Sequence, residues 1–149
     1  MGKRVIVVGG GIAGMQTALK LSAGGVSALL LERDADLGGK LTGWHKLFPS
    51  FTPAHEVLDE LRRRLAASDV EVRTRCEVAE VARDGVTLST GERLEADAVV
   101  VATGFTLFDA RIKEEYGYGI YDNVYTTVDI ERMLNEGRVA LKDGTAPRR

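Results

Sequence analysis

Three glycines near the start of the chain have the spacing that a phosphate-binding turn requires. The run Gly9-Gly10-Gly11-Ile12-Ala13-Gly14 matches the pattern G-x-G-x-x-G. In such a turn the first glycine permits a tight bend, the second lets the backbone approach a pyrophosphate, and the third lets the next helix pack on the preceding strand. Free backbone N–H groups at the start of that helix, including those of Ile12 and Ala13, would then hold the phosphate oxygens.

A carboxylate follows these glycines at the distance expected of a ribose-binding residue. Glu32 lies 23 positions after Gly9, where a second apolar run ends. A carboxylate at this place accepts hydrogen bonds from ribose hydroxyls in dinucleotide-binding folds. Its neighbour Arg33 could suit a 2′-phosphate, but Glu32 would repel one. The alternative is a turn that binds nothing, followed by a surface Glu-Arg pair. The order and spacing of the elements favour a dinucleotide site.

The elements around these residues predict a β-α-β unit. Residues 4–8, RVIVV, are typical of a strand buried on both faces. Residues 12–23 have apolar positions at helical spacing, and Gly24-Gly25 ends that helix. Residues 27–31, SALLL, predict a second buried strand, and a crossover of this kind is right-handed. Since Glu32 stands at a strand end, we expect it to contribute little to stability without ligand.

The middle of the chain predicts a loop followed by a helix. Residues 33–52 are loop-like, and Pro53 then suits the first position of a helix whose N-cap is Thr52. The apolar stripe of this helix consists of Val57, Leu58, Leu61 and Leu65.

The second half of the chain predicts short strands and one more helix. Asp-Gly and Thr-Gly turns indicate antiparallel hairpins between residues 77 and 95, and AVVVA at 98–102 predicts a fully buried strand. A last helix, capped by Thr126 or Thr127, ends at Gly137 and precedes a polar tail. The expected strands of this half are residues 70–72, 77–83, 86–89, 93–95 and 98–102.

Composition limits the classes to which the chain can belong. Its 149 residues suit one domain with a real core. A net charge of −2 gives no electrostatic case for nucleic acid or an acidic membrane surface. No stretch approaches the roughly 18 apolar residues of a membrane span. The single cysteine, Cys76, excludes an intrachain disulfide and a cysteine metal cage. We therefore expect a cytoplasmic protein that binds neither nucleic acid nor membrane.

Several motifs together resemble the FAD domain of the glutathione-reductase-type flavoproteins. They are Gly38-Gly39-Lys40, the expected hairpins, and AVVVATG at 98–104. The resemblance implies an α/β Rossmann-like FAD/NAD(P)-binding domain with a parallel sheet, crossover helices and a small antiparallel β-meander. It also implies that Gly39 and Lys40 lie near the FAD phosphates and ribityl chain, that the backbone of Val78 contacts the adenine, and that the pyrophosphate passes close to Thr103-Gly104.

The candidate cofactor-binding residues therefore form two groups. The motif itself indicates Gly9, Gly11, Ile12, Ala13, Gly14, Glu32 and Arg33, and the resemblance adds Gly39, Lys40, Val78, Ala102, Thr103 and Gly104.

Two longer stretches are similar to the A-type subunit of heterodisulfide reductase, which is an FAD-dependent electron-transfer protein. They are LGGKLTGWHKLFPSF at 37–51 and GFTLFDARIKEEYGYGIYDNVYTTVDIERML at 104–134. This resemblance implies an FAD-dependent oxidoreductase domain or subunit, with other redox subunits or domains as partners and a homo-oligomer as a further possibility. It divides the single expected domain, 1–149, into a dinucleotide-binding core at 1–104 and a family-specific extension at 105–149.

The chain departs from that family at two points. The family has cluster-binding cysteines after the equivalent of Phe48-Pro49, whereas this chain has Ser50-Phe51-Thr52-Pro53, which contains no thiol. The family also continues into a second nucleotide domain, so this chain looks like the N-terminal portion of a larger flavoprotein.

The other reactive side chains suggest no catalytic or metal site. Cys76, His45 and His55 have no partner at catalytic or metal-ligand spacing. The four tyrosines at 116–125 are expected to pack and hydrogen-bond within an ordered loop. Two rival functions remain open, namely a nucleotide-binding scaffold without redox work and a simple NAD-binding module.

Overall fold

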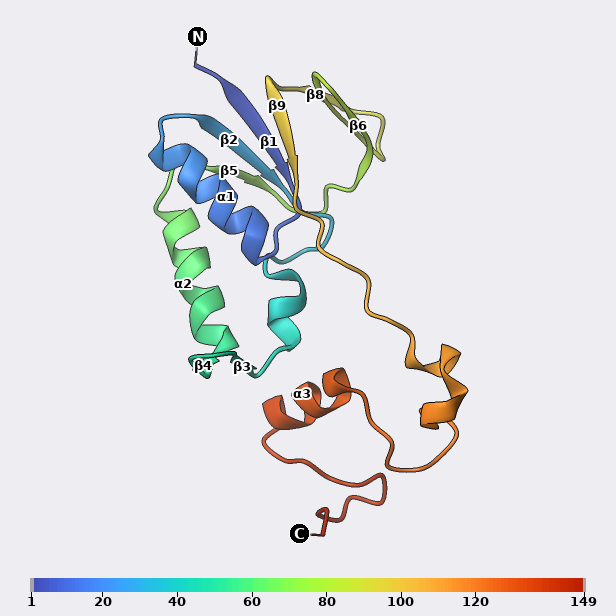
Figure 1. Ribbon diagram of the computed structural model, residues 1–149. Coiled ribbons are helices and arrows are strands. Elements are labelled where there is room, and N and C mark those ends of the chain that lie inside the picture. Colours follow the sequence, from blue (N-terminus) through green and yellow to red (C-terminus); the bar gives the residue numbers. More distant parts are fainter. Residues whose placement is uncertain (1, 149) are drawn as a thin grey trace. The chain divides into compact units, whose positions relative to one another are not determined.

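A computed structural model describes residues 2–148, which form two compact units (Figure 1). The first unit contains the residues up to Thr42 together with Glu56–Gly104. The second unit contains Gly43–His55 and the residues from Phe105 onward. The second unit thus joins residues 43–55 to the C-terminal extension.

A four-stranded parallel sheet forms the centre of the first unit. Its strands are β1 (Arg4–Val8), β2 (Ser27–Leu31), β5 (Glu71–Arg73) and β9 (Ala98–Val101), in the order β5-β2-β1-β9. β1 and β2 are central and nearly all their residues are buried, as their apolar sequences predict. The parallel sheet of a Rossmann-like fold is therefore confirmed.

The prediction of a fully buried strand at residues 98–102 is wrong. β9 spans only Ala98–Val101, its residues are half-buried or exposed, and Val101 is 60% exposed. The reason is its position, because among residues 2–148 β9 pairs only with β1 and forms an edge of the sheet. An unbroken run of valines predicts a strand but does not distinguish a central strand from an edge strand.

The helix α1 (Ile12–Ala23) packs on one face of the sheet, with Met15, Ala18 and Leu19 buried. A Cβ added to Gly14 would lie 3.5 Å from the side chain of Leu30, which places α1 against the Leu30 face of β2. The expected crossover helix is confirmed, and Gly25, with φ of +73°, supplies the left-handed residue that follows it.

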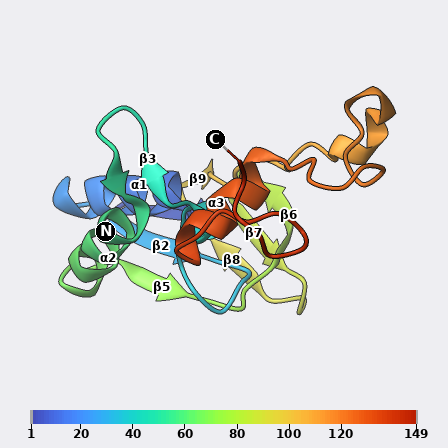
Figure 2. The same ribbon diagram turned by 90° about the horizontal axis from the view of Figure 1, so that it is seen from below.

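A small antiparallel sheet covers the opposite face. Its strands are β6 (Val78–Ala82), β7 (Gly85–Leu88) and β8 (Arg93–Glu95), which confirms the expected hairpins. Figures 1 and 2 show this sheet on the side of the parallel strands away from α1 and α2 (Ala54–Ala66). The core between the two sheets consists of Ile6, Val8, Leu29, Leu31, Val86, Leu88 and Leu94.

The second helix begins one residue later than its sequence predicts. α2 spans Ala54–Ala66, and Thr52–Pro53 form the short strand β4, which pairs with β3 (Lys46–Leu47). Thr52 is therefore not the N-cap. The chain is still extended at Pro53, and the backbone N–H of Ala54 donates to the carbonyl of His45 at 3.0 Å. The expected apolar stripe is present, with Leu58, Leu61 and Leu65 buried and Val57 half-buried.

Part of the segment expected to be a loop is also regular. Gly39–Gly43 form a 3₁₀ helix, and β3 follows it. The strand expected at residues 70–72 lies one residue further on, as β5.

The second unit is held by contacts between residues 43–55 and α3 (Thr127–Asn135). The backbone N–H of His45 donates to the Glu131 carboxylate at 2.6 Å, and the Asn135 side-chain amide donates to the Gly43 carbonyl at 3.0 Å. Thr126 is the N-cap of α3, which settles the choice between Thr126 and Thr127. Two 3₁₀ turns, Ala110–Ile112 and Glu114–Tyr116, complete this unit.

The tyrosines do not all pack as expected. Tyr116 and Tyr121 are 71% and 66% exposed, whereas Tyr118 and Tyr125 are half-buried. The Tyr125 hydroxyl donates to the Asn123 side chain at 3.1 Å. The Tyr121 ring still lies against Gly117, because a Cβ added to that glycine would be 2.3 Å from the ring. The expectation of packing therefore fails for Tyr116. Within residues 2–148, no helix combines the length and the apolar character that crossing a membrane requires.

Candidate nucleotide-binding site

The glycine turn joins β1 to α1, and two of its glycines are required by the protein itself. Gly9 has φ of +109°, and a Cβ there would lie 2.4 Å from the carbonyl oxygen of Ala102. A Cβ on Gly14 would lie 1.8 Å from the Gly9 carbonyl oxygen. Both distances are far shorter than a van der Waals contact, so these two positions need glycine for the turn to close.

Gly11 differs from the other two glycines because its own surroundings are open. A Cβ at this position would have no heavy atom of residues 2–148 within 4 Å apart from those of residues 10–12, and its backbone is extended, with φ of −74°. The fold therefore does not explain a glycine here, whereas a ligand that approaches the backbone closely would. Gly11 is the N-cap of α1, and the first N–H groups of a helix have no partner inside it. The N–H groups of Ile12 and Ala13 are the first two of α1 and lie in this turn.

Glu32 connects the end of β2 to this turn. Its side chain is buried, with 7% of the residue exposed. One carboxylate oxygen accepts a hydrogen bond from the Gly10 N–H at 2.6 Å, and the other accepts one from the Asp34 N–H at 2.9 Å. Each oxygen of an ionised carboxylate can accept a second bond, so capacity for further donors remains. Both bonds are made without a ligand, so the position at a strand end is not the only feature that bears on what Glu32 contributes to stability.

A cavity of about 170 Å³ lies beside Glu32 and brings five of the predicted residues together. These five are Gly9, Glu32, Arg33, Val78 and Thr103. The cavity lies at the carboxyl ends of β1 and β2 and at the first residue of β6, because Val8, Leu31 and Val78 line it. Open α/β sheets bind ligands at the carboxyl ends of their strands. Sites that enclose a whole small molecule measure roughly 300–1,000 Å³, so this cavity suits one end of a dinucleotide.

Sequence reasoning missed four residues of this cavity, namely the strand ends Val8 and Leu31 together with Cys76 and Glu77. The backbone N–H of Cys76 donates to the Glu32 carbonyl at 2.8 Å, and that of Arg75 donates to the Asp34 carbonyl at 3.0 Å. These bonds fold the segment before β6 onto the end of β2. The available signal was adjacency, since Cys76 and Glu77 directly precede Val78, which was itself expected in the site.

The remaining predicted residues do not line the cavity, and several of them lie around the turn. The backbone of Gly38 pairs with the turn, and its N–H donates to the Gly10 carbonyl at 2.8 Å. Gly39 follows directly, and a Cβ there would be 3.4 Å from Gly11 Cα. Lys40 is half-buried in the adjoining 3₁₀ helix, and Gly104 is exposed, with φ of +77°. The Ala102 carbonyl lies against Gly9, as described above.

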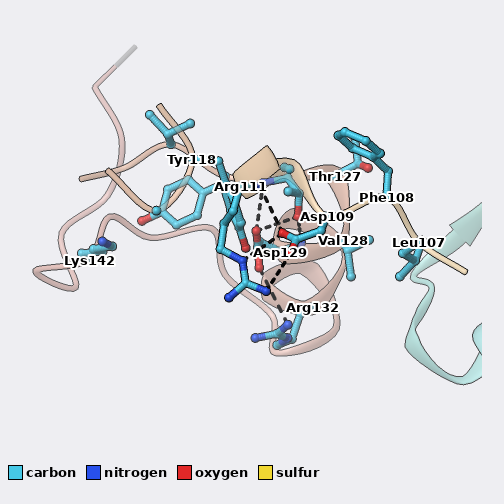
Figure 3. A pocket seen from close by; sticks show the side chains of 15 residues that line it. Leu107, Phe108, Asp109, Arg111, Tyr118, Thr127, Val128, Asp129, Arg132 and Lys142 are labelled. Carbon is cyan, nitrogen blue, oxygen red and sulfur yellow. Dashed lines mark hydrogen bonds and ion pairs between the residues drawn. The ribbon is translucent and has the colours of Figure 1, made fainter. Parts of the chain in front are cut away.

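A larger cavity, of about 920 Å³, lies in the second unit and contains none of the predicted residues (Figure 3). Figure 3 shows Arg111 directed toward Asp109, and the guanidinium donates to that carboxylate at 2.9 Å. This bond holds the pKa of Asp109 below its usual value. Arg132 pairs with Asp129 at 3.7 Å, and Lys142 pairs with Asp122 at 2.9 Å. Since each cation already has an acidic partner, the lining offers no unpaired charge to a ligand.

The described part of the chain contains no group of three or more His, Cys, Asp or Glu side chains that could hold a metal ion. The site therefore rests on backbone groups, one buried carboxylate and a small cavity.

Two family models match the chain. One describes an NAD(P)-binding Rossmann-like domain and matches residues 7–60, which include the glycine turn and Glu32. The other, pyridine nucleotide-disulphide oxidoreductase, matches residues 46–132.

Curated relatives resemble the N-terminal part of the chain. The A-type subunit of the H(2)/formate:CoB-CoM heterodisulfide,ferredoxin reductase of Methanococcus maripaludis is 45% identical over 62 residues, which cover 38% of this chain and 9% of the relative. An iron-sulfur A-type subunit of CoB–CoM heterodisulfide reductase from Methanopyrus kandleri is 51% identical over 63 residues, with the same coverage. The chain thus matches about a tenth of these relatives' length, and the resemblance expected from the sequence is confirmed for this part.

Solved structures share the fold. The ferredoxin reductase for the CYP199A2 system from Rhodopseudomonas palustris superposes with a TM-score of 0.50 and 22% identity, covering 77% of this chain and 27% of that one. The tetrameric 2-methyl-3-hydroxypyridine-5-carboxylic acid oxygenase gives a TM-score of 0.54 and 22% identity, covering 66% and 38%. At this identity the likeness concerns the fold alone.

Proposed function

The chain belongs to the pyridine nucleotide-disulphide oxidoreductase family, and from this premise we propose that it binds FAD as an electron-transfer oxidoreductase domain. The observation that carries the proposal is the glycine turn beside the buried Glu32. An open Gly11, a helix N-terminus and a carboxylate above a small cavity fit the adenosine diphosphate half of a dinucleotide.

Each part of that half has a candidate partner. The N–H groups at the start of α1 would bind the pyrophosphate, and Glu32 would accept hydrogen bonds from the ribose hydroxyls. The backbone of Val78 would contact the adenine, while Gly39, Lys40, Thr103 and Gly104 would border the path toward the flavin. When bound, FAD supplies the electron transfer itself. The protein's own contribution is to bind and orient the nucleotide.

The proposal extends to the setting of the domain. The similarity to heterodisulfide reductase subunits supports a role within a larger flavoprotein or complex, in which other redox subunits or domains supply the electron donor and acceptor. We place the protein in the cytoplasm.

The test combines an absorbance spectrum with competition calorimetry. We expect a purified sample to bind FAD and show flavin absorbance, and ADP to compete within about tenfold of FAD, or about 1.4 kcal/mol. FMN, which lacks the adenosine half, should bind weakly. Tight FMN binding without competition by ADP would overturn the proposal. A colourless protein that is stabilised by NAD or ADP, and not by FAD, would indicate the NAD-binding module or the non-redox scaffold.

A further inference from the structure

We infer that Arg62 of α2 is a positioning residue of the nucleotide site, because it holds the segment that supports the glycine turn and thereby raises the affinity for ADP. Arg62 lies outside the glycine motif and does not line the cavity beside Glu32. The inference rests on the proposed function and deepens it. It is carried by a series of contacts that runs from α2 to Gly10 within the first unit.

Gly10, which directly precedes Gly11 in the turn, is contacted on three sides. Its N–H donates to the Glu32 carboxylate at 2.6 Å, and its carbonyl accepts the Gly38 N–H at 2.8 Å. A Cβ built on Gly10 would lie 2.5 Å from Leu37 Cδ2, so the Leu37 side chain packs directly on this glycine. Two of the three contacts therefore come from the adjacent pair Leu37 and Gly38.

This pair is held in turn by α2. The Arg62 guanidinium donates to the Leu37 carbonyl, and a charged donor makes a stronger hydrogen bond than a neutral one. Leu58 is buried and lies against Gly38, since a Cβ built there would be 3.0 Å from both Leu58 methyl carbons. The preceding residues, 33–36, are exposed and belong to no helix or strand. The pair is therefore fixed from α2 rather than from the chain that leads into it.

The consequence for binding is the readiness of the turn. Its N–H groups can hold a pyrophosphate only while Gly10 and Gly11 keep their orientation. Gly11 and Gly38 form an isolated parallel bridge, so a shift of the pair would displace the turn as well. A protein whose binding-competent form is only partly populated binds more weakly by that fraction. Arg62 raises the fraction in which the turn is ready for the nucleotide.

The test is Arg62→Met, which keeps an unbranched apolar stem and removes every N–H donor. We expect the affinity of the folded variant for ADP, measured by calorimetry, to fall at least about fivefold, the lower end of the usual coupling between linked sites. In the ligand-free variant the Gly38 amide, which donates to Gly10, should exchange its hydrogen faster than in the wild type, as measured by NMR.

The two measurements together separate positioning from other roles. A purely structural residue would lower the urea midpoint and leave the ADP affinity of the folded protein unchanged, which would overturn the inference. A residue that touches only the ligand would lower the affinity and leave exchange at Gly38 unchanged, and this result would overturn it as well.

Arg63→Met is the matched control. Arg63 is the next residue of α2, is exposed and pairs with Glu60. Its replacement removes the same charge from the same helix, so it reproduces any long-range effect on an anionic nucleotide. ADP affinity and exchange at Gly38 should both stay near the wild-type values. If Arg63→Met loses as much affinity as Arg62→Met, the loss reports charge alone and the inference is wrong.

The remaining outcomes distinguish the inference from the function on which it rests. If the wild type binds ADP and Arg62→Met binds it equally well, the nucleotide site stands and the positioning role is wrong. If the wild type binds neither ADP nor FAD, the proposed function itself fails. Should Arg62→Met not fold, Arg62→Gln, with a shorter neutral side chain, is measured in the same way against the same expected results.

Discussion

Gly11 and Gly14 stand three positions apart in one motif, yet different neighbours require them. Gly14 faces the Gly9 carbonyl oxygen, and Gly11 faces open space. Substitution at each position can therefore separate the demands of the fold from those of the ligand.

We expect Gly11→Ala to fold normally and to lose at least about tenfold in affinity for ADP, or about 1.4 kcal/mol, because its Cβ occupies the space of the pyrophosphate. Gly14→Ala should destabilise the ligand-free protein by about 1–3 kcal/mol or more, because its Cβ overlaps a backbone oxygen. Urea unfolding without ligand and ADP calorimetry measure the two effects. Wild-type ADP affinity in Gly11→Ala would contradict the assignment of the turn.

Glu32 provides a second test, because both of its carboxylate oxygens accept backbone hydrogen bonds. In Glu32→Gln one oxygen becomes an NH₂ group, which would face the N–H of Gly10 or Asp34, donor against donor. We expect a loss of about 1–3 kcal/mol in the free energy of unfolding without ligand, together with weaker ADP binding. Urea unfolding measures the first effect and calorimetry the second.

Arg33→Gln is the matched control for Glu32→Gln. The Arg33 side chain is exposed and pairs only loosely, at 3.8 Å, with Asp34. Its replacement should change stability by no more than about 0.5 kcal/mol. An unfolding midpoint of Glu32→Gln equal to that of the wild type would show that the buried carboxylate does not brace the turn.

At the residue scale, the sequence predicted which residues belong to the site better than it predicted their contacts. The spacing of Gly9, Gly11 and Glu32 was sufficient to place them at one edge of a parallel sheet. The two backbone bonds of Glu32 and the place of Cys76 in the cavity were not predictable from spacing. The carboxylate bonds depend on how the chain turns at Gly10 and Asp34. The place of Cys76 depends on residues 73–76 folding back onto β2, and no local pattern in the sequence encodes that contact.

Among the elements, α3 has the clearest local stabilisation. Thr126 and Asp129 form a capping box, in which the Thr126 N–H donates to the Asp129 carboxylate at 2.9 Å and the Asp129 N–H donates to the Thr126 hydroxyl at 3.3 Å. The pattern T-x-x-D in the sequence carries this motif. The Thr126 hydroxyl also donates to the carboxylate at 2.6 Å, which is the main cause of the lowered pKa of Asp129.

We expect Thr126→Ala and Asp129→Asn each to destabilise α3 by about 1 kcal/mol, the usual contribution of an N-cap. The measurement is amide hydrogen exchange across Thr127–Asn135 near neutral pH. Thr127→Ala, one position along and without a role in the box, is the control. Equal exchange rates in all four proteins would show that the box does not hold the helix.

The capping box should also weaken in acid. Because the folded-state pKa of Asp129 is lowered, its stabilisation is present above the unfolded-state pKa of about 4 and is lost as the pH falls through the lower, folded-state value. Helical circular dichroism between pH 5 and pH 2 should therefore decline more in the wild type than in Asp129→Asn. Identical acid profiles of the two proteins would contradict this contribution.

At the scale of elements, the sequence predicted the bounds of most helices and strands correctly, but it did not predict that β3 and β4 form and pair. α1, β1 and β2 have the bounds that periodicity and glycine stops predict. Pro53 was assigned to a helix because proline suits a first helical turn. Its pairing with Lys46 in β3 and β4 keeps it extended, and that pairing is a contact between strands which helix signals do not reveal.

For the molecule as a whole, the division into two units predicts which residues a bound nucleotide protects from amide exchange. All proposed contacts with the adenosine diphosphate lie in the first unit, and the charged groups around the large cavity of the second are already paired. ADP should therefore slow amide exchange at residues 9–14, 31–34 and 76–78 and leave α3 unchanged. Protection concentrated at residues 107–132 instead would move the site to the second unit.

Which segments of the chain belong to each unit could not be predicted from the sequence. Residues 43–55 belong with α3 because of the hydrogen bonds from His45 to Glu131 and from Asn135 to Gly43. These bonds join positions about ninety residues apart, and patterns read from neighbouring residues cannot specify them.

The edge strand β9 has a practical consequence for handling the protein. Within residues 2–148 one side of its backbone has no strand partner, and its valines are partly exposed. An unpaired, apolar edge is a template on which a strand from another molecule can add. Concentrated samples should therefore aggregate through β9, which light scattering would detect. A lysine in place of the exposed Val101 would act as a gatekeeper, because an incoming strand would have to desolvate its charge.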